Sequence, residues 1–158
     1  MTYYIDIQNA TDDELAISEE ELTRLASLVL NHYKKEAELT VRFVSLEEIT
    51  YLNKTYRQFD KPTNVLAFPS NLPPDVQLEC PLLGDVIICP KVLLTESKEL
   101  NKTLEAHWTL ILIHGILHLL GYDHIKDDEA VIMQAVEIKL LAELGYTNPY
   151  DAEGYQLE

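Results

Sequence analysis

Three histidines near the middle of the chain have the side-chain type and spacing of a metal site. His114 and His118 are four residues apart, which on a helix places both imidazoles on one face, one turn apart. Gly121 can end such a helix, because glycine adopts the left-handed conformation without a steric clash, and the chain then turns back to His124. A catalytic zinc ion uses three such protein ligands and keeps a fourth position for water. The pattern therefore predicts one Zn²⁺ bound by His114, His118 and His124.

His107 belongs to the same predicted helix, seven residues before His114. Seven residues span about two helical turns, so the two side chains share a face but are too far apart to bind one ion. We interpret His107 as a supporting or structural residue rather than a fourth ligand. A single histidine on an apolar helix is usually a hydrogen-bonded core residue, and only the group of three favours a metal site.

Gly115 separates this pattern from a large class of metalloproteases. Enzymes with the H-E-x-x-H motif carry a glutamate general base directly after the first histidine, and here that position is Gly115. A zinc peptidase or amidohydrolase therefore remains an alternative, but its best-known base is missing.

Hydrophobic periodicity predicts the elements that must position these residues. Four strands are expected at Tyr3–Gln8, Leu39–Val44, Val65–Phe68 and Gly84–Cys89. Helices are expected from Ser18 to about Tyr33, from Ser45 to about Tyr56, from Pro90 to about Leu100, from Thr103 or Leu104 to the stop at Gly121, and from Asp127 or Asp128 to Gly145. The strands and helices do not alternate strictly along the chain, which predicts an α+β fold. We expect a single domain over residues 1–158, with a mixed sheet of about four strands, about five flanking helices and the metal site on the central histidine helix.

Local signals refine this outline. Ser18 and Ser45 each have a glutamate three residues later, which is a capping box at a helix start. Prolines on both sides of Val65–Phe68 favour an edge strand, whereas the apolar strand Gly84–Cys89 is expected to be central. The apolar stripe of the last helix is expected at Val131, Ile132, Ala135, Val136, Ile138 and Leu141.

Segments without periodicity are interpreted as loops. Asn71–Pro81 is rich in proline, and the acidic tail after about residue 147 is expected to be flexible. The N-terminus has neither a basic nor an apolar leader segment, and the apolar run Leu110–Leu120 is too short to span a bilayer. We therefore expect a cytoplasmic protein that does not enter membranes, with Cys80 and Cys89 as free thiols.

The charge balance restricts how the chain can contact nucleic acid. The net charge is −15, from 27 acidic and 12 basic residues, which argues against a protein that coats nucleic acid by charge alone. Lys54, Arg57 and Lys61 nevertheless fall within eight residues and are the best candidate for a local anion-binding patch. The planar guanidinium of Arg57 suits a phosphate, although exposed charges are often only solvated surface.

The histidine motif and two further segments resemble the YbeY family of bacterial zinc-dependent endoribonucleases. Residues 114–124 read H-G-I-L-H-L-L-G-Y-D-H, which is similar to the family signature. Residues 53–69 resemble the second block, N-x-x-Y-R-x-x-D-x-P-T-[DN]-V-L-x-F-P, and residues 83–88, L-G-D-V-I-I, resemble a third. Many members carry aspartate and then serine where this chain has Asn64 and Ala67. The difference excludes neither side chain from a role, but we do not assign Asn64 as a base or a ligand.

The resemblance implies a fold, an activity and partners. It implies a mixed sheet with the zinc helix packed on it, and cleavage of single-stranded RNA in ribosomal RNA processing and ribosome maturation. The family's arginine in the second block, implicated in catalysis, corresponds to Arg57, while Asp85 in the third block is expected to have a structural or supporting role. Ribosomal RNA is the implied substrate, and ribosomal proteins or an assembly GTPase are the expected protein partners.

The hypothesis for the chemistry follows from these residues. Zinc on the three histidines would lower the pKa of a water molecule toward about 7, and Arg57 would stabilise the extra negative charge of the transition state. Tyr122, Asp123 and Asp85 are candidates for a separate general base only because they lie near the ligands or in a family block. The second alternative is a non-catalytic ribosome assembly factor in which zinc only stabilises the fold.

Overall fold

The computed structural model describes residues 2–70 and 80–150, and four strands within them form one mixed sheet. The strands are β1 (Thr2–Asn9), β2 (Glu36–Phe43), β3 (Val65–Pro69) and β4 (Leu82–Ile88). Their order across the sheet is β1-β2-β4-β3. β1, β2 and β4 are parallel, and β3 runs antiparallel to β4. The expected edge position of β3 and central position of β4 are therefore confirmed.

Five helices complete the described fold, and local capping explains where three of them begin. They are α1 (Glu19–Leu30), α2 (Leu46–Arg57), α3 (Pro90–Glu99), α4 (Leu104–Leu119) and α5 (Asp127–Glu143). The hydroxyls of Ser18 and Ser45 each accept the backbone N–H three residues later at 3.1 Å, and Thr103 accepts that of Ala106 at 3.2 Å. The α+β fold, the N-caps at Ser18 and Ser45 and the start of α4 are confirmed, while α1 ends at Leu30, three residues before the expected end.

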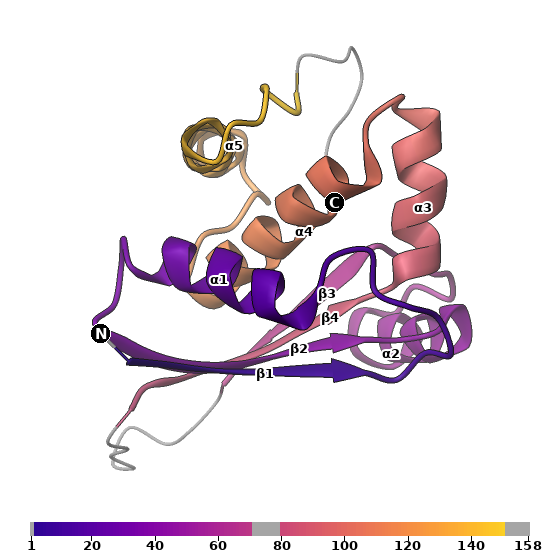
Figure 1. Cartoon of the computed structure of the whole chain (residues 1–158). Coiled ribbons are helices and arrows are strands. Elements are labelled where there is room, and N and C mark those ends of the chain that lie inside the picture. The colour runs from indigo at the N-terminus through magenta and orange to yellow at the C-terminus, as the bar shows by residue number, and fades with distance from the viewer. Residues whose placement is uncertain (1, 71–79, 151–158) are drawn as a thin grey trace.

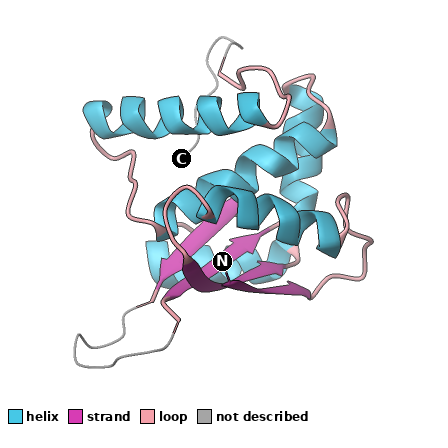
Figure 2. Cartoon of the chain, turned by 60° about the vertical axis from the view of Figure 1, so that its left-hand side comes forward, coloured by secondary structure: helices cyan, strands magenta, loops and turns pink. Residues whose placement is uncertain are grey.

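The helices cover both faces of the sheet, as Figures 1 and 2 show. α1 and α4 lie on one face, and α5 packs on α4 on the side away from the sheet (Figure 1). α2 covers the opposite face, where Ile49 joins a smaller core cluster with Leu66 of β3 and Ile87 of β4 (Figure 2). α4 is therefore the central helix: every residue from 107 to 117 is buried. A helix that is buried on all sides must satisfy any polar side chain it carries from neighbouring elements.

Gly115 sets how closely α4 approaches the sheet. A Cβ atom at this position would lie 2.5 Å from Cγ1 of Val86 on β4 and 3.3 Å from Cγ2 of Val65 on β3. The helix axis can approach the sheet this closely only because residue 115 has no side chain. Since Gly115 directly follows His114, this contact also fixes the rotation of the helix and so the direction of the histidines on either side.

The expected apolar stripe of α5 is wrong at its first three positions. Val131 and Ile132 are 67% and 56% exposed, and Ala135 is exposed as well. The buried residues of α5 are instead Met133, Glu137, Leu140 and Leu141. The helix is apolar on more than one side, so apolar spacing alone does not determine which side packs. The side that faces α4 includes an acidic residue, which a hydrophobic pattern cannot select.

Several smaller expectations concern the ends and loops. Cys80 and Cys89 are free thiols, as expected. No helix in the described parts of the chain has both the length and the apolar character needed to cross a membrane. Most of the proline-rich segment, residues 71–79, and the end of the tail, residues 151–158, lie outside the described residues. The start of the tail contacts the body, because Lys102 Nζ donates to the carbonyl oxygen of Pro149 at 2.7 Å.

Gly115→Ala should destabilise the fold although alanine is the better helix former. Alanine improves helix propensity by about 1 kcal/mol, whereas an overpacked core costs about 1–3 kcal/mol. We therefore expect a lower free energy of unfolding, measured by urea denaturation of chelator-treated protein so that metal does not contribute. Val86→Ala removes the clashing methyl groups, so Gly115→Ala should cost less in the Val86→Ala background than in the wild type. A stabilised Gly115→Ala protein would contradict the close contact.

Candidate metal centre

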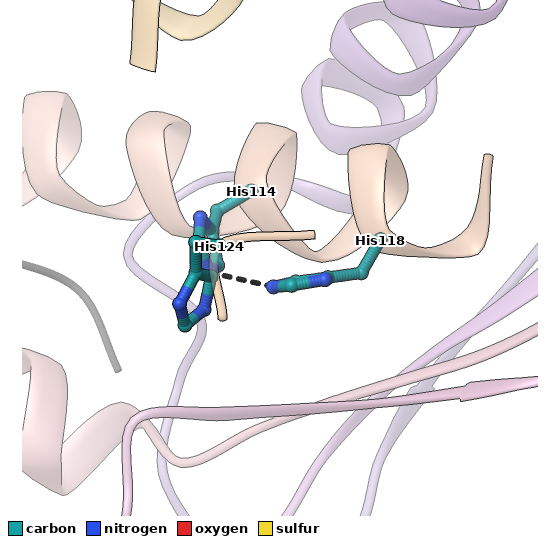
Figure 3. Close-up of side chains that lie close together, drawn as sticks. All are labelled: His114, His118 and His124. Carbon is teal, nitrogen blue, oxygen red and sulfur yellow. Dashed lines mark hydrogen bonds between the residues drawn. The ribbon is translucent and has the colours of Figure 1, made fainter. Parts of the chain in front are cut away.

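The structure brings the three predicted histidines together. His114 and His118 project from the last turns of α4, and His124 approaches them from the loop that follows (Figure 3). One ligand atom from each ring lies within 4.8 Å of those of the other two. His114 is buried and the other two are partly exposed. Three neutral imidazoles converging on one point, with one side open, form a suitable donor set for a tetrahedral metal ion such as zinc.

The end of α4 explains why His124 returns to the helix. Gly121 adopts a positive φ of +104°, its N–H donates to the carbonyl oxygen of His118 at 3.1 Å, and Tyr122 N–H donates to that of Leu117 at 3.0 Å. These two bonds are a Schellman motif, which reverses the chain directly after the helix. Asp123 then accepts the backbone N–H of His124 at 2.7 Å, which holds the turn in place.

Hydrogen bonds to the outer ring nitrogens point the inner nitrogens at one another. His118 Nδ1 lies 3.0 Å from the carbonyl oxygen of Tyr122, which can only accept, so Nδ1 carries the proton. His114 Nδ1 lies 2.8 Å from Oε2 of Glu137, to which it donates. In neutral rings both Nε2 atoms then carry lone pairs, yet they lie 3.0 Å apart (Figure 3). Two lone pairs at this distance repel each other, and a shared cation would remove the repulsion.

Glu137 is a functional candidate that the sequence analysis missed. Its side chain is 1% exposed, and its second oxygen, Oε1, accepts the hydroxyl of Tyr150 at 2.7 Å. A buried carboxylate that orients a ligating histidine and raises its basicity is a recurrent feature of metal sites. The available signal was one acidic residue within the apolar stretch of α5, but nothing in the sequence connects it to a histidine 23 residues earlier.

Burial keeps His118 in the form that can bind metal. Loss of solvent contact, together with smaller charge repulsion from His114 and His124, lowers the pKa of His118 to about 4. Its bond to the carbonyl oxygen of Tyr122 opposes this shift. At neutral pH the ring is therefore neutral, and its Nε2 lone pair is available without loss of a proton.

A cavity of about 530 Å³ adjoins the three histidines. The histidines and residues 121–125 line one side of it, and Arg57, Phe59, Thr63 and the start of β3 line the other. Two segments that are more than forty residues apart in the sequence therefore face the same space. The histidine cluster is open to a volume large enough for part of a substrate.

Arg57 is held at this cavity by β3. Its Nη2 donates to the carbonyl oxygen of Ala67 at 3.0 Å, and the guanidinium carbon lies 5.3 Å from the centre of the Phe68 ring. One hydrogen bond and one cation–π contact orient the group, and the guanidinium has further N–H donors that can bind an anion. Of the other two predicted cations, Lys54 lies 3.9 Å from Asp60 and does not line the cavity, and Lys61 lies 5.6 Å from the centre of the Phe59 ring.

The remaining candidates divide between the cavity and the rest of the fold. Tyr122 and Asp123 line the cavity, whereas Asp85 is exposed on β4 and does not. His107 is 1% exposed and lies 2.9 Å from Glu96 of α3, away from the three histidines. Asn64 also bonds to Glu96, at 3.2 Å, so it joins β3 to α3 and is absent from the cavity lining.

The orientation of Gly115 accounts for the missing glutamate. The helix face at this position lies against Val86 and Val65 of the sheet. A glutamate at this position would collide with the sheet. The arrangement of the H-E-x-x-H peptidases is therefore sterically excluded at this site.

Comparisons with known proteins agree with this geometry. Residues 6–145 match the family model described as Endoribonuclease YbeY. Proteins named Endoribonuclease YbeY from the Corby and Philadelphia 1 strains of Legionella pneumophila are 68% identical over all 158 residues, which is 100% of both chains. The solution structure of TM1509 from Thermotoga maritima has a TM-score of 0.58 and 27% identity, and the match covers 96% of this chain and 99% of that one. A match over most of the chain and full-length relatives at this identity place the protein in the YbeY family.

Proposed function

We propose that this chain is a metal-dependent endoribonuclease that cuts single-stranded RNA during ribosomal RNA processing. The observation that carries the proposal is the shared cavity, in which Arg57 faces the three-histidine cluster. A metal ligand set and a fixed guanidinium around one open space suit hydrolysis of a phosphodiester, because the reaction needs both an activated water and stabilisation of negative charge. The names of the full-length relatives support the same activity.

His114 and His118 would hold one Zn²⁺ through their Nε2 lone pairs, together with a ring nitrogen of His124. Bound zinc supplies a Lewis acid and lowers the pKa of water toward about 7. Glu137 fixes the tautomer of His114, and the Tyr122 carbonyl fixes that of His118. These bonds keep the ligand lone pairs directed at the common point without rearrangement when metal binds.

Arg57 would bind the phosphate that is being cut. Ala67 accepts one of its N–H groups, and the ring of Phe68 supports the guanidinium plane, so the remaining donors are presented in one orientation. A preoriented charged donor stabilises the added negative charge of the transition state without the cost of ordering a flexible side chain.

The two alternative functions are less well supported by the described residues. A peptidase of the H-E-x-x-H type needs a glutamate where the sheet leaves room only for glycine. A purely structural zinc would normally have four protein ligands, whereas the described residues form a group of three beside an open cavity. A structural role also gives no reason for Arg57 to line the same cavity.

The net charge of −15 suits contact with basic partners as well as restricted contact with RNA. We include ribosomal proteins or an assembly GTPase as partners, and the cytoplasm as the place of action, because ribosomes mature there. The acidic body would prevent indiscriminate RNA binding, and the cations beside the cavity would supply the local attraction.

His118→Ala should remove most of the zinc, because two remaining nitrogen ligands bind far more weakly than three. Elemental analysis after dialysis should give about one zinc per chain for the wild type and a small fraction of that for the variant, with a lower melting temperature.

Glu137→Gln should keep the fold but weaken zinc affinity by about 10- to 100-fold.

His32→Ala is the matched control, since this histidine pairs with Glu143 outside the cluster. It should retain full zinc. Full zinc occupancy in His118→Ala would show that the three histidines are not the ligands.

The metal-free protein should lose stability as the pH falls from about 6.5 toward 4. The pKa of His118 is about 4 when folded, compared with about 6.5 in an unfolded chain. Between these two pKa values His118 is protonated in the unfolded state and neutral in the folded state. The free energy of unfolding is therefore at its full value above about pH 6.5 and falls as the pH is lowered below it. Urea denaturation of chelator-treated protein at pH 7.5 and 5.0 measures the loss. His118→Gln does not titrate and should lose less, and an equal loss in both proteins would contradict the shift.

Arg57→Ala should reduce cleavage of single-stranded RNA by about 10²- to 10³-fold, the usual effect of deleting one transition-state donor. Zinc content and melting temperature should hardly change, because Arg57 is exposed and touches no proposed ligand. Arg57→Lys should recover only part of the rate, because an ammonium cannot reproduce the planar donor geometry.

Lys54→Ala is the control, a nearby exposed cation that does not line the cavity. Its cleavage rate should match the wild type. If Arg57→Ala remains fully active while His118→Ala is inactive, Arg57 has no role in the reaction. If both retain the activity, the cleavage belongs to a contaminating nuclease and the proposed function is wrong.

A further inference from the structure

An exposed aromatic ring lies on the rim of the cavity that the histidines also line. Phe59 is 58% exposed and lines the cavity beside Arg57. Tyr51 and Tyr56 are similarly exposed, at 66% and 56%, but neither lines it. Single exposed apolar residues are common on protein surfaces. The position of Phe59, rather than its exposure, is therefore what requires an explanation.

The backbone around Phe59 is held firmly to the end of α2. Gln58 adopts the left-handed conformation with φ of 63°, and Phe59 N–H donates to the carbonyl oxygen of Asn53 at 3.3 Å. The Asn53 side chain in turn donates to the carbonyl oxygen of Lys61 at 2.9 Å. The ring is thus presented from a fixed turn, so a ligand that packs on it pays little entropy for ordering the backbone.

One cation lies over the ring in an otherwise acidic protein, and a second lines the same cavity. Lys61 Nζ lies 5.6 Å from the centre of the Phe59 ring, and Arg57 lines the cavity two residues earlier in the chain. Ile125, which is 82% exposed, lines the cavity as well. An aromatic face flanked by positive charge is how single-stranded nucleic acid is bound, because bases stack on the ring while cations attract the phosphates.

We propose that Phe59 stacks on an unpaired base next to the scissile phosphate and so contributes to the selection of single-stranded RNA. The proposal rests on the proposed nuclease function. A base inside a duplex is stacked and paired on both sides, so it cannot place its face against Phe59 without leaving the helix. Stacking at this rim would place the neighbouring phosphate near Arg57 and the histidine cluster, which line the same cavity.

The test pairs enzyme variants with substrates that lack one base. Zinc-loaded wild type, Phe59→Ala and Phe59→Trp are assayed for kcat/KM on a short single-stranded oligoribonucleotide cut at one bond. Phe59→Ala should lower kcat/KM by about 5- to 100-fold, the range of a single base–aromatic stack. Phe59→Trp should retain most of the wild-type value, because it preserves an aromatic face. Tyr51→Ala, an exposed aromatic outside the cavity lining, should behave as wild type.

The same proteins are then given oligonucleotides with one abasic residue at successive positions around the cut bond. At the stacked position, the wild type should lose about the same factor as Phe59→Ala loses on the intact substrate, and Phe59→Ala should lose nothing further. This non-additivity identifies a direct contact, which a merely structural effect of Phe59 cannot produce.

The remaining outcomes distinguish failure of the stacking role of Phe59 from failure of the proposed nuclease function. Unchanged kcat/KM in Phe59→Ala, with an active wild type, would remove the stacking role and leave the nuclease function intact. A loss in Phe59→Ala that adds to the abasic loss at every position, or is not rescued in Phe59→Trp, would make Phe59 structural. Absence of RNA cleavage by the zinc-loaded wild type would refute the proposed function itself.

Discussion

The close contact between α4 and the sheet at Gly115 is the constraint on which the site depends. Because residue 115 has no side chain, the helix lies directly on Val86 and Val65, and this contact fixes its rotation. With that rotation fixed, His114 and His118 face the cavity at the edge formed by β3, where Arg57 is also bound. The same contact that completes the core therefore determines where a metal can bind and what lies opposite it.

Burying a helix on all sides creates an electrostatic problem that the neighbouring elements solve. The side chains of His114 and Glu137 are 2% and 1% exposed, and an unpaired charge at such a depth would be strongly unfavourable. The two side chains are paired instead: Glu137 accepts from His114 Nδ1 through one oxygen and from Tyr150 through the other. The carboxylate also offsets part of the positive charge that a divalent metal would bring. α5 thus contributes to the site through a single acidic residue, although it lies in the outer layer.

Local patterns in the sequence were sufficient for the elements and for the histidine cluster. The caps at Ser18 and Ser45, the edge strand and the return of the chain after Gly121 all depend on neighbouring residues, and the structure agrees with them. Contacts between distant elements were not predictable in this way. The strand order, the packed side of α5 and the Glu137–His114 bond depend on which surfaces meet. Phe59 was missed because exposure on a cavity rim has no signature in hydrophobic periodicity.

An acidic chain can still act on RNA, because general electrostatic attraction to phosphates and binding at a few fixed groups in the cavity are separate contributions to affinity. General attraction to RNA grows with the number of phosphates neutralised, and a chain with 27 acidic and 12 basic residues cannot rely on it. The cavity needs only a few fixed groups, because Arg57 is oriented by Ala67 and Phe68. Few phosphate contacts give weak binding to RNA in general. Discrimination between single-stranded and paired RNA is a difference between two binding free energies, so a general attraction common to both contributes nothing to it. With the stacking proposed for Phe59, an acidic body therefore lowers the affinity for RNA in general and leaves the preference for an unpaired base intact.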